Sequence, residues 1–129
     1  MSSPFIYIGS NTIKEGKVDE CKKMAQEIVE LVKANEPRVI AFNFFLDEQA
    51  RQLVCVQVHP DSASMDHHMR VISEHLTIAY DILEETVSEQ LYGPGGEGMV
   101  DEFRQWAPNA TFTVLPVHEA GFTRSSAAT

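Results

Sequence analysis

The chain has 129 residues, the size of one domain, and its 43% hydrophobic and 22% charged residues are typical of a folded globular protein. Nineteen acidic residues against ten basic ones give a net charge of −9, and such a surface repels nucleic acid and anionic lipid. We therefore expect no nucleic-acid partner and no membrane partner. Met1–Ile13 shows no export signal and no apolar run is long enough to cross a bilayer, so the expected location is cytoplasmic.

Strand and helix patterns alternate in the first half of the chain. A strand is predicted from Phe5 to about Ile13, followed by a helix from about Lys17 to Ala34 with one apolar stripe. Asn35-Glu36-Pro37 ends this helix because the residue before a proline resists the α conformation. Two strands are predicted at Arg38–Leu46 and Leu53–Val58, and their short connection indicates an antiparallel hairpin.

A second helix begins near Asp61, Ser62 or Ser64, each of which can cap it. Apolar residues recur every three or four positions from Met65 to Leu83, and we predict that the helix runs unbroken to about Leu91. The remaining elements are a flexible glycine-rich loop, a short helix, a last strand and a polar tail, predicted at 93–98, 99–106, 111–117 and 121–129.

The predicted order is strand, helix, strand, strand, helix, strand, which is the split βαβ pattern of the ferredoxin-like α+β fold. We expect one domain over 1–129, with a core at about 4–118 and a helical, glycine-rich extension at 77–109. Helices then cover one face of an antiparallel sheet and leave an apolar face open. An apolar face of this size predicts a homodimer, in which two sheets pair as a dimeric α/β barrel.

Acidic residues without basic neighbours fill the stretch between Arg70 and Arg104. We interpret this stretch as a solvated helix face and loop, and the alternative is a docking surface for a basic partner. The members of the stretch are Glu74, Asp81, Glu84, Glu85, Glu89, Glu97, Asp101 and Glu102.

His68 is the first candidate for chemistry. On the second helix it lies about 60° from the centre of the apolar stripe, and His75 lies about 80° away on the same flank. Such a histidine can act as a base or as a donor to a ligand; the alternative is a boundary histidine bonded to backbone or water, which we favour for His75. His67 points to the surface. Because about 10 Å of helical rise separates His68 from His75, we expect no metal site.

Two asparagines lie in predicted strands, where asparagine is disfavoured. Asn11 ends the first strand, and Asn43 is flanked by phenylalanines, so we expect it to be buried and in need of a partner. A ligand is one partner, and neighbouring backbone or a second subunit is the other. The further candidates for ligand binding can equally be packing residues, and they are Tyr7, Phe44, His59, Met69 and His75.

Neither cysteine is predicted to be reactive. Cys21 lies on a helical apolar stripe and Cys55 lies within a strand, so both are expected to be small core residues rather than members of a disulfide. The loop Gly93–Gly98 lacks the Lys-Ser/Thr pair of a phosphate-binding loop.

The sequence resembles the antibiotic biosynthesis monooxygenase-like family of the dimeric α/β-barrel superfamily. The resemblance covers roughly 4–76 and 111–124, from Ile8–Gly16 with its following helix, through Glu36-Pro37 and Leu53–Val58 to the helix with His68, and again at Leu115–Arg124. It implies a ferredoxin-like fold, a sheet-to-sheet dimer and a cavity between sheet and helices.

Some members of that family oxidise polycyclic phenols with dioxygen and no cofactor, and relatives degrade haem. The resemblance therefore implies a cofactor-independent monooxygenase for a small aromatic or quinone-type molecule, with His68, Asn11 and Asn43 as catalytic residues. A non-catalytic, ligand-binding or stress-related dimer is the alternative. Haem is the weaker enzymatic option, because His59 stands where the family often has a tryptophan.

Overall fold

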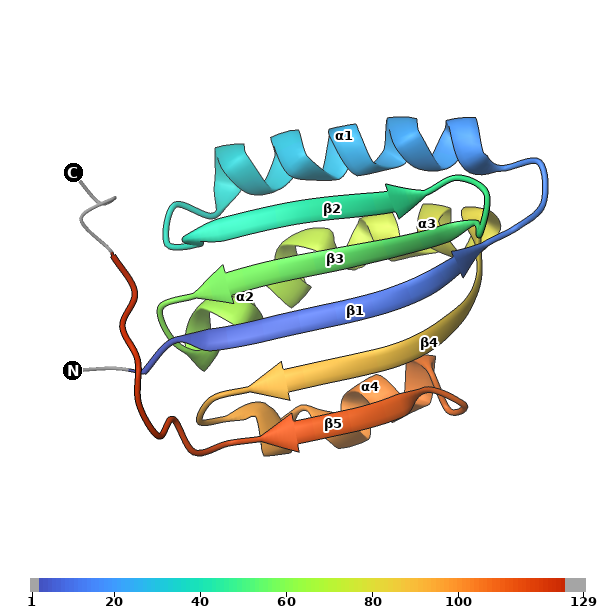
Figure 1. Cartoon of the computed structure of the whole chain (residues 1–129). Coiled ribbons are helices and arrows are strands. Elements are labelled where there is room, and N and C mark those ends of the chain that lie inside the picture. The colour runs from blue at the N-terminus through green and yellow to red at the C-terminus, as the bar shows by residue number, and fades with distance from the viewer. Residues whose placement is uncertain (1–2, 125–129) are drawn as a thin grey trace.

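A five-stranded sheet carries its helices on one face (Figure 1). The structure is a computed structural model and describes residues 3–124, so part of the predicted tail, at 125–129, lies outside the described residues. The elements in chain order are β1 (Phe5–Ile13), α1 (Val18–Asn35), β2 (Ala41–Asp47), β3 (Gln52–His59), α2 (Ser62–Ile72), the 3-10 turn η1 (Ser73–His75), α3 (Leu76–Ile82), β4 (Leu83–Tyr92), the 3-10 turn η2 (Gly96–Gly98), α4 (Val100–Trp106) and β5 (Thr111–Leu115).

The strands lie in the order β2-β3-β1-β4-β5, which is the ferredoxin-like arrangement with one strand added at an edge. The predicted hairpin is confirmed: β2 and β3 are antiparallel, with Phe44 opposite Cys55. Strand β1 lies between β3 and β4 and is antiparallel to both. The last strand, β5, pairs parallel with β4, so the sheet is mixed rather than purely antiparallel.

The prediction of an unbroken helix to about Leu91 is wrong. Helix α2 ends at Ile72, and after one 3-10 turn helix α3 ends at Ile82, where β4 begins. Glutamates in Leu83–Tyr92 favour a helix in isolation, but β1 needs a partner on its free edge and β4 supplies it. The fourth strand of the fold is therefore β4, and the predicted last strand, observed at Thr111–Leu115, is a fifth one.

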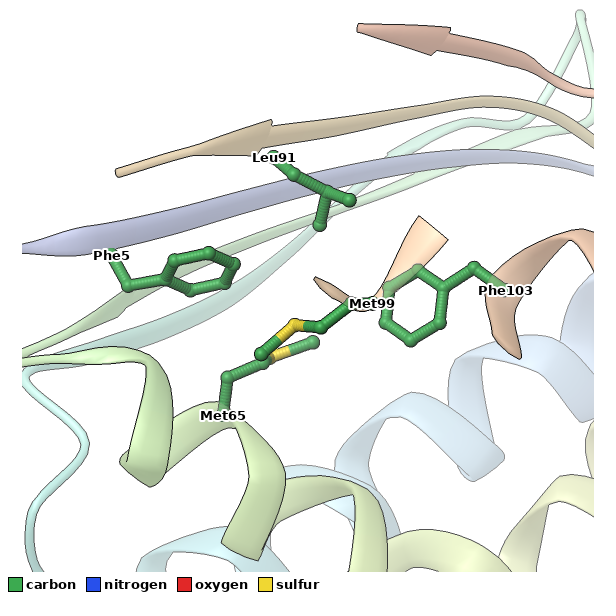
Figure 2. Packing of buried hydrophobic residues seen from close by; sticks show 5 residues of the cluster. All are labelled: Phe5, Met65, Leu91, Met99 and Phe103. Atoms are coloured by element: carbon green, nitrogen blue, oxygen red, sulfur yellow. The ribbon is translucent and has the colours of Figure 1, made fainter. Parts of the chain in front are cut away.

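Two clusters of buried apolar side chains lie between the sheet and the helices. Figure 2 shows the first, in which Met65 of α2 and Phe103 of α4 pack toward side chains of the sheet. The first cluster comprises Phe5, Met65, Leu91, Met99 and Phe103, and the second comprises Ile13, Cys21, Met24, Leu53 and Ile82. Cys21 is buried as expected, and Cys55 is partly buried.

The opposite face of the sheet is open. Because side chains alternate along a strand, the inward positions of β1 and β2, such as Tyr7 and Phe44, leave Ile8, Asn43 and Phe45 on the far side. Phe45 is 60% exposed and Leu115 on β5 is 57% exposed. The apolar face expected from the sequence is therefore present in the single chain.

Candidate functional site

A cavity of about 350 Å³ lies between the sheet and helices α2, α3 and α4. Strands β1 and β4 supply most of its polar groups, and the helices supply most of its apolar wall. Four residues singled out in the sequence line it together, namely Tyr7, Asn11, His68 and Met69. Its apolar lining includes Met65, Ile72, Leu76, Ala79, Leu83, Phe103 and Trp106. A mostly apolar cavity with a few convergent polar groups is typical of a small-molecule site.

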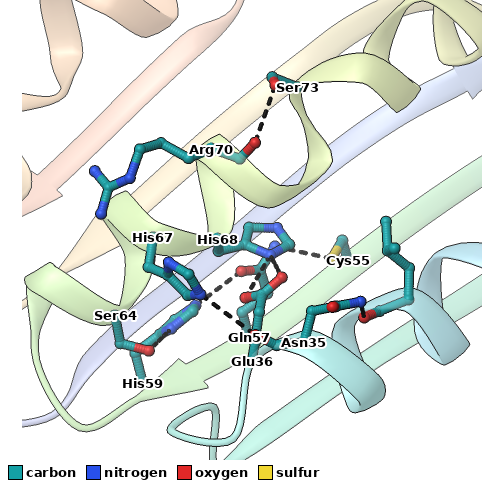
Figure 3. A network of polar contacts seen from close by, with 11 residues as sticks. Asn35, Glu36, Cys55, Gln57, His59, Ser64, His67, His68, Arg70 and Ser73 are labelled. Carbon is teal, nitrogen blue, oxygen red and sulfur yellow. Dashed lines mark hydrogen bonds and ion pairs between the residues drawn. The ribbon is translucent and has the colours of Figure 1, made fainter.

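His68 projects from α2 and is paired with a carboxylate from the turn after α1. Its Nδ1 lies 3.0 Å from Oε1 and 2.9 Å from Oε2 of Glu36, and both side chains are 1% exposed (Figure 3). Since a carboxylate accepts, Nδ1–H is the donor, and Nε2 is the ring nitrogen left to accept a proton. The sequence places His68 about 60° from the centre of the apolar stripe, and in the structure its side chain is fully buried.

Glu36 was missed because the sequence shows it only as part of the stop signal before Pro37. Its carboxylate is buried by a partner 32 positions away, and no local pattern reports such a contact. The turn that ends α1 directs the Glu36 side chain toward α2, so the residues that end the helix also position the carboxylate.

His59 lies beside His68 and is held in a second polar chain. The centroids of the two rings are 6.0 Å apart. His59 Nε2 lies 2.9 Å from Gln57 Oε1, and His59 Nδ1 lies 2.7 Å from Ser64 Oγ. Burial, with His68 as the next cause, lowers the pKa of His59 to about 4, so the ring is neutral at pH 7. Its Nε2–H donates to Gln57 and its Nδ1 accepts from Ser64. Gln57 lines the cavity and His59 lies behind it.

Tyr7 and Glu89 form a hydrogen-bonded pair on neighbouring strands of the cavity floor. The Tyr7 hydroxyl donates to Glu89 Oε1 over 2.7 Å. Burial raises the pKa of Glu89 to about 7, against the opposing effect of that hydrogen bond, and burial together with Glu89 raises the pKa of Tyr7 well above its ordinary value. The interpretation of Glu89 as part of a solvated helix face is wrong: it lies on β4, 7% exposed, inside the cavity.

Asn11 completes the polar part of the floor. Its Oδ1 accepts a hydrogen bond of 2.7 Å from the Thr86 hydroxyl, at a point where β1 and β4 change register. This contact leaves the amide NH₂ group of Asn11 as a donor on a cavity wall. A bulge that re-aims side chains beside a site is a recurrent feature of sheets.

The other candidates lie elsewhere. Asn43 is exposed on the open face of the single chain, where β2 holds it on the side opposite the cavity, so it is not buried within the chain itself. Phe44 packs on the second apolar cluster. His75 is half-buried in η1, outside the cavity lining, with its Nδ1 unpaired among the described residues. His67 is exposed, as expected, and lies 3.3 Å from the carbonyl of Asn35 (Figure 3).

Aromatic and acidic side chains from α3, α4 and β4 form the rim of the cavity. Tyr80 and Trp106 stack with ring centroids 6.1 Å apart, and both are partly exposed. Glu84 and Glu85 line the same cavity, and among its described lining residues there is no Lys or Arg. The rim therefore disfavours an anionic ligand.

Among residues 3–124, no group of three His, Cys, Asp or Glu side chains could hold a metal ion. Within the same residues, no helix is both long and apolar enough to span a bilayer.

No protein-family model matches the chain, and no curated protein matches it in sequence. Solved structures do match. MupZ from Pseudomonas fluorescens is 18% identical with a TM-score of 0.73, over 95% of this chain and 96% of that chain. A conserved protein from Methanosarcina mazei Go1 is 22% identical with a TM-score of 0.61, over 69% of this chain and 90% of that chain.

An antibiotic biosynthesis monooxygenase of known structure is 20% identical, with a TM-score of 0.56 over 67% of this chain and 92% of that chain. At such identities the likeness is one of fold. The expected resemblance to antibiotic biosynthesis monooxygenase-like proteins, and with it the ferredoxin-like fold, is thus confirmed.

Proposed function

We propose that this chain is a cofactor-independent, monooxygenase-like enzyme for a small, uncharged aromatic or quinone-type molecule. The observation that carries the proposal is the buried His68–Glu36 pair on a cavity wall, because the carboxylate fixes the ring with Nε2 as a base. A mostly apolar cavity of about 350 Å³ suits a ring system, and a solved structure of this fold is an antibiotic biosynthesis monooxygenase. Two free thiols, Cys21 and Cys55, fit a cytoplasmic location.

The bound molecule itself supplies the electrons in this reaction. His68 Nε2 takes the proton of a phenolic hydroxyl, and the Glu36 carboxylate stabilises the imidazolium that forms. The phenolate passes one electron to dioxygen, and the two radicals join through a new carbon–oxygen bond. The peroxide anion then takes the proton back from His68, and loss of water leaves a quinone. One phenol and one dioxygen give one quinone and one water.

Asn11 stabilises the charge that develops in the first step. Its Oδ1 is occupied by Thr86, so its NH₂ group is the part that donates to the phenolate oxygen. The acidic rim makes a phenol that is neutral before it binds the preferred substrate, because a carboxylate or phosphate group would meet Glu84 and Glu85.

The proposal includes a homodimer through the open sheet face. Alternating residues of β1, β2 and β3 present apolar side chains there, and Phe45 is exposed in the single chain. Burying apolar area on such a face favours association, and the loss of translational and rotational freedom opposes it. We expect Phe45→Glu to shift the protein from dimer to monomer in light scattering, whereas a monomeric wild type would contradict this part of the proposal.

Dioxygen uptake tests the enzymatic part. Purified protein is incubated with 1-naphthol or anthrone, and dioxygen consumption and quinone absorbance are followed together. We expect His68→Ala to lower turnover by about 100-fold or more.

The matched control is His67→Ala, which removes the exposed neighbouring imidazole and should leave turnover unchanged. Binding of these compounds without turnover, with His68→Ala lowering only the affinity, would replace the enzyme by the ligand-binding dimer. Equal turnover in both variants would exclude His68 as the base.

A further inference from the structure

A second pair of titratable side chains lies on the sheet side of the cavity, whereas His68 comes from the helix side. Tyr7 on β1 donates a hydrogen bond of 2.7 Å to Glu89 on β4, and both residues line the cavity. His68 and this pair are therefore two separate proton-transfer groups on the walls of one cavity of about 350 Å³.

The Tyr7 ring is held in one position. A Cβ atom on Gly9 would lie 2.3 Å from the Tyr7 hydroxyl oxygen, so glycine at this position leaves the space that the hydroxyl occupies. Phe103 of α4 meets the Tyr7 ring edge-on at 5.9 Å between centroids. A hydroxyl fixed in this way fixes Glu89 in turn, as expected for a preorganised site rather than for a mobile surface carboxyl.

Glu89 is the member of the pair that can give a proton at neutral pH. Burial raises its pKa to about 7, so about half of the molecules carry the proton there. Its Oε1 accepts from Tyr7, which leaves Oε2 to carry the proton. Tyr7 on β1 and Cys55 on β3 interact with it, and the other titratable groups that line the same cavity are His68 on α2 and Glu84 and Glu85 on β4.

We propose that Glu89, positioned by Tyr7, is the general acid of this cavity: it protonates an oxygen atom of the bound molecule while His68 removes a proton from a carbon atom. The inference rests on the proposed role of His68 as the base. A ring nitrogen that can accept a proton and a carboxyl that can give one, on opposite walls of one cavity, are placed to act together as base and acid. The substrate class is then an uncharged phenol or ketone that carries an oxygen acceptor.

In the oxygenation, this pair acts on the carbon-bound hydroperoxide. His68 takes the proton from the carbon that carries the peroxide, and the electrons of that C–H bond form the carbonyl. The O–O bond breaks, and the outer oxygen leaves as water with the proton that Glu89 supplies. Glu89 regains a proton from solvent and His68 releases one, so the enzyme returns to its starting state.

The same pair should act on a ketone without dioxygen, and this supplies the test. With 1-tetralone in deuterated water, the C–H electrons beside the carbonyl form the carbon–carbon double bond of the enol, and Glu89 protonates the carbonyl oxygen. The reverse step delivers deuterium to carbon. We expect NMR under nitrogen to show faster hydrogen–deuterium exchange at this carbon with the protein than in buffer alone. Glu89→Gln should lower the enzymatic exchange rate about 100-fold, and Tyr7→Phe should lower it about tenfold.

The pH profile separates an acid from a structural residue. In the wild type the exchange rate should fall above about pH 7, as Glu89 loses its proton, and in Glu89→Gln this alkaline limb should disappear. Glu97→Gln removes an exposed carboxylate on η2 and should change neither rate nor profile. If Glu89→Gln does not fold, Tyr7→Phe supplies a second test. Loss of the phenol hydrogen bond raises the pKa of Glu89, so the alkaline limb of the exchange profile should move to higher pH.

The outcomes separate this inference from the proposed function. Exchange that is lost in His68→Ala but unchanged in Glu89→Gln overturns the acid role and leaves the base in place. No exchange above buffer in the wild type, together with dioxygen uptake that depends on His68, overturns the acid–base pairing alone. Exchange that neither variant changes overturns both assignments.

Discussion

Glu36 and Glu89 are both buried carboxyls near the same cavity, and they differ in what they face. Glu36 lies against an imidazole ring that can carry positive charge, with 2.9 Å between Oε2 and Nδ1 of His68. Glu89 lies against a phenol, with 2.7 Å between Oε1 and the Tyr7 hydroxyl. The imidazole N–H donates to the Glu36 carboxylate and the ring can take up a further proton beside it, whereas the Tyr7 hydroxyl offers Glu89 a single neutral donor. The partner, rather than the depth of burial, separates the two roles.

The two carboxyls also differ in reach. Glu36 lies behind His68 and is absent from the cavity lining, so it acts on a bound molecule only through the imidazole. Glu89 lines the cavity and meets a ligand directly. In the proposed mechanism Glu36 is therefore a positioning residue and Glu89 is the general acid.

Removal of Glu36 should have the largest effect on stability. Glu36→Ala leaves the buried imidazole N–H without its acceptor, and an unsatisfied buried donor costs up to about 3 kcal/mol. Glu36→Gln keeps the shape of the side chain and one acceptor, so we expect a smaller loss of stability. Turnover should still be about 100-fold lower than in the wild type. Urea unfolding and dioxygen uptake measure the two effects. A Glu36→Ala protein as stable as the wild type would show that this pair does not hold His68.

Glu89→Gln should have an effect on stability that depends on pH. The folded-state pKa of Glu89, about 7, lies above its ordinary value of 4.5, so unfolding releases a proton between these pH values. The unfolding free energy of the wild type therefore falls by up to about 3 kcal/mol as pH rises from 4.5 to 7. Glutamine does not titrate, so the variant shows no such loss. We expect the unfolding free energy of the variant, relative to the wild type, to rise across this window. A difference that stays constant from pH 4 to pH 8 would contradict the raised pKa.

Tyr7→Phe should give the smallest change and sharpen the contrast. The hydrogen bond from Tyr7 favours the ionised form of Glu89, so its loss should raise the pKa of Glu89 further and cost about 1 kcal/mol of stability. A Glu89 carboxyl signal followed by carbon-13 NMR reports the shift. Tyr92→Phe, whose hydroxyl donates to Gln90 on the same strand, is the matched control and should leave the Glu89 titration in place. A downward shift in Tyr7→Phe would contradict the assigned direction.

The fold was largely predictable because the strand and helix periods of the first half are clear. β1, α1 and the β2–β3 hairpin lie close to the positions expected from alternation, helical spacing and the Glu36-Pro37 stop signal. The segment Leu83–Tyr92 was not predictable in this way, because its glutamates favour a helix locally and only its pairing with β1 makes it a strand.

The site was predictable only where it depended on local periodicity. The helical angle of His68 pointed inward, and the structure brings it together with Tyr7 and Asn11. Glu36 and Glu89 gave no local signal, since their partners lie 32 and 82 positions away in the chain. Asn43 failed for a different reason: alternation shows which residues share a face, but its phenylalanine neighbours do not show which face the helices cover.

The most direct test of His68 as the base is nitrogen-15 NMR of its ring, with and without 1-naphthol. In the free protein we expect Nδ1 to carry the proton and Nε2 to be bare, because Glu36 accepts at Nδ1. Binding of the phenol should move the Nε2 signal toward the protonated position, and Glu36→Gln should weaken that response. A free-state ring protonated on Nε2 alone, or an Nε2 signal unchanged by saturating 1-naphthol, would contradict the assignment of His68 as the base.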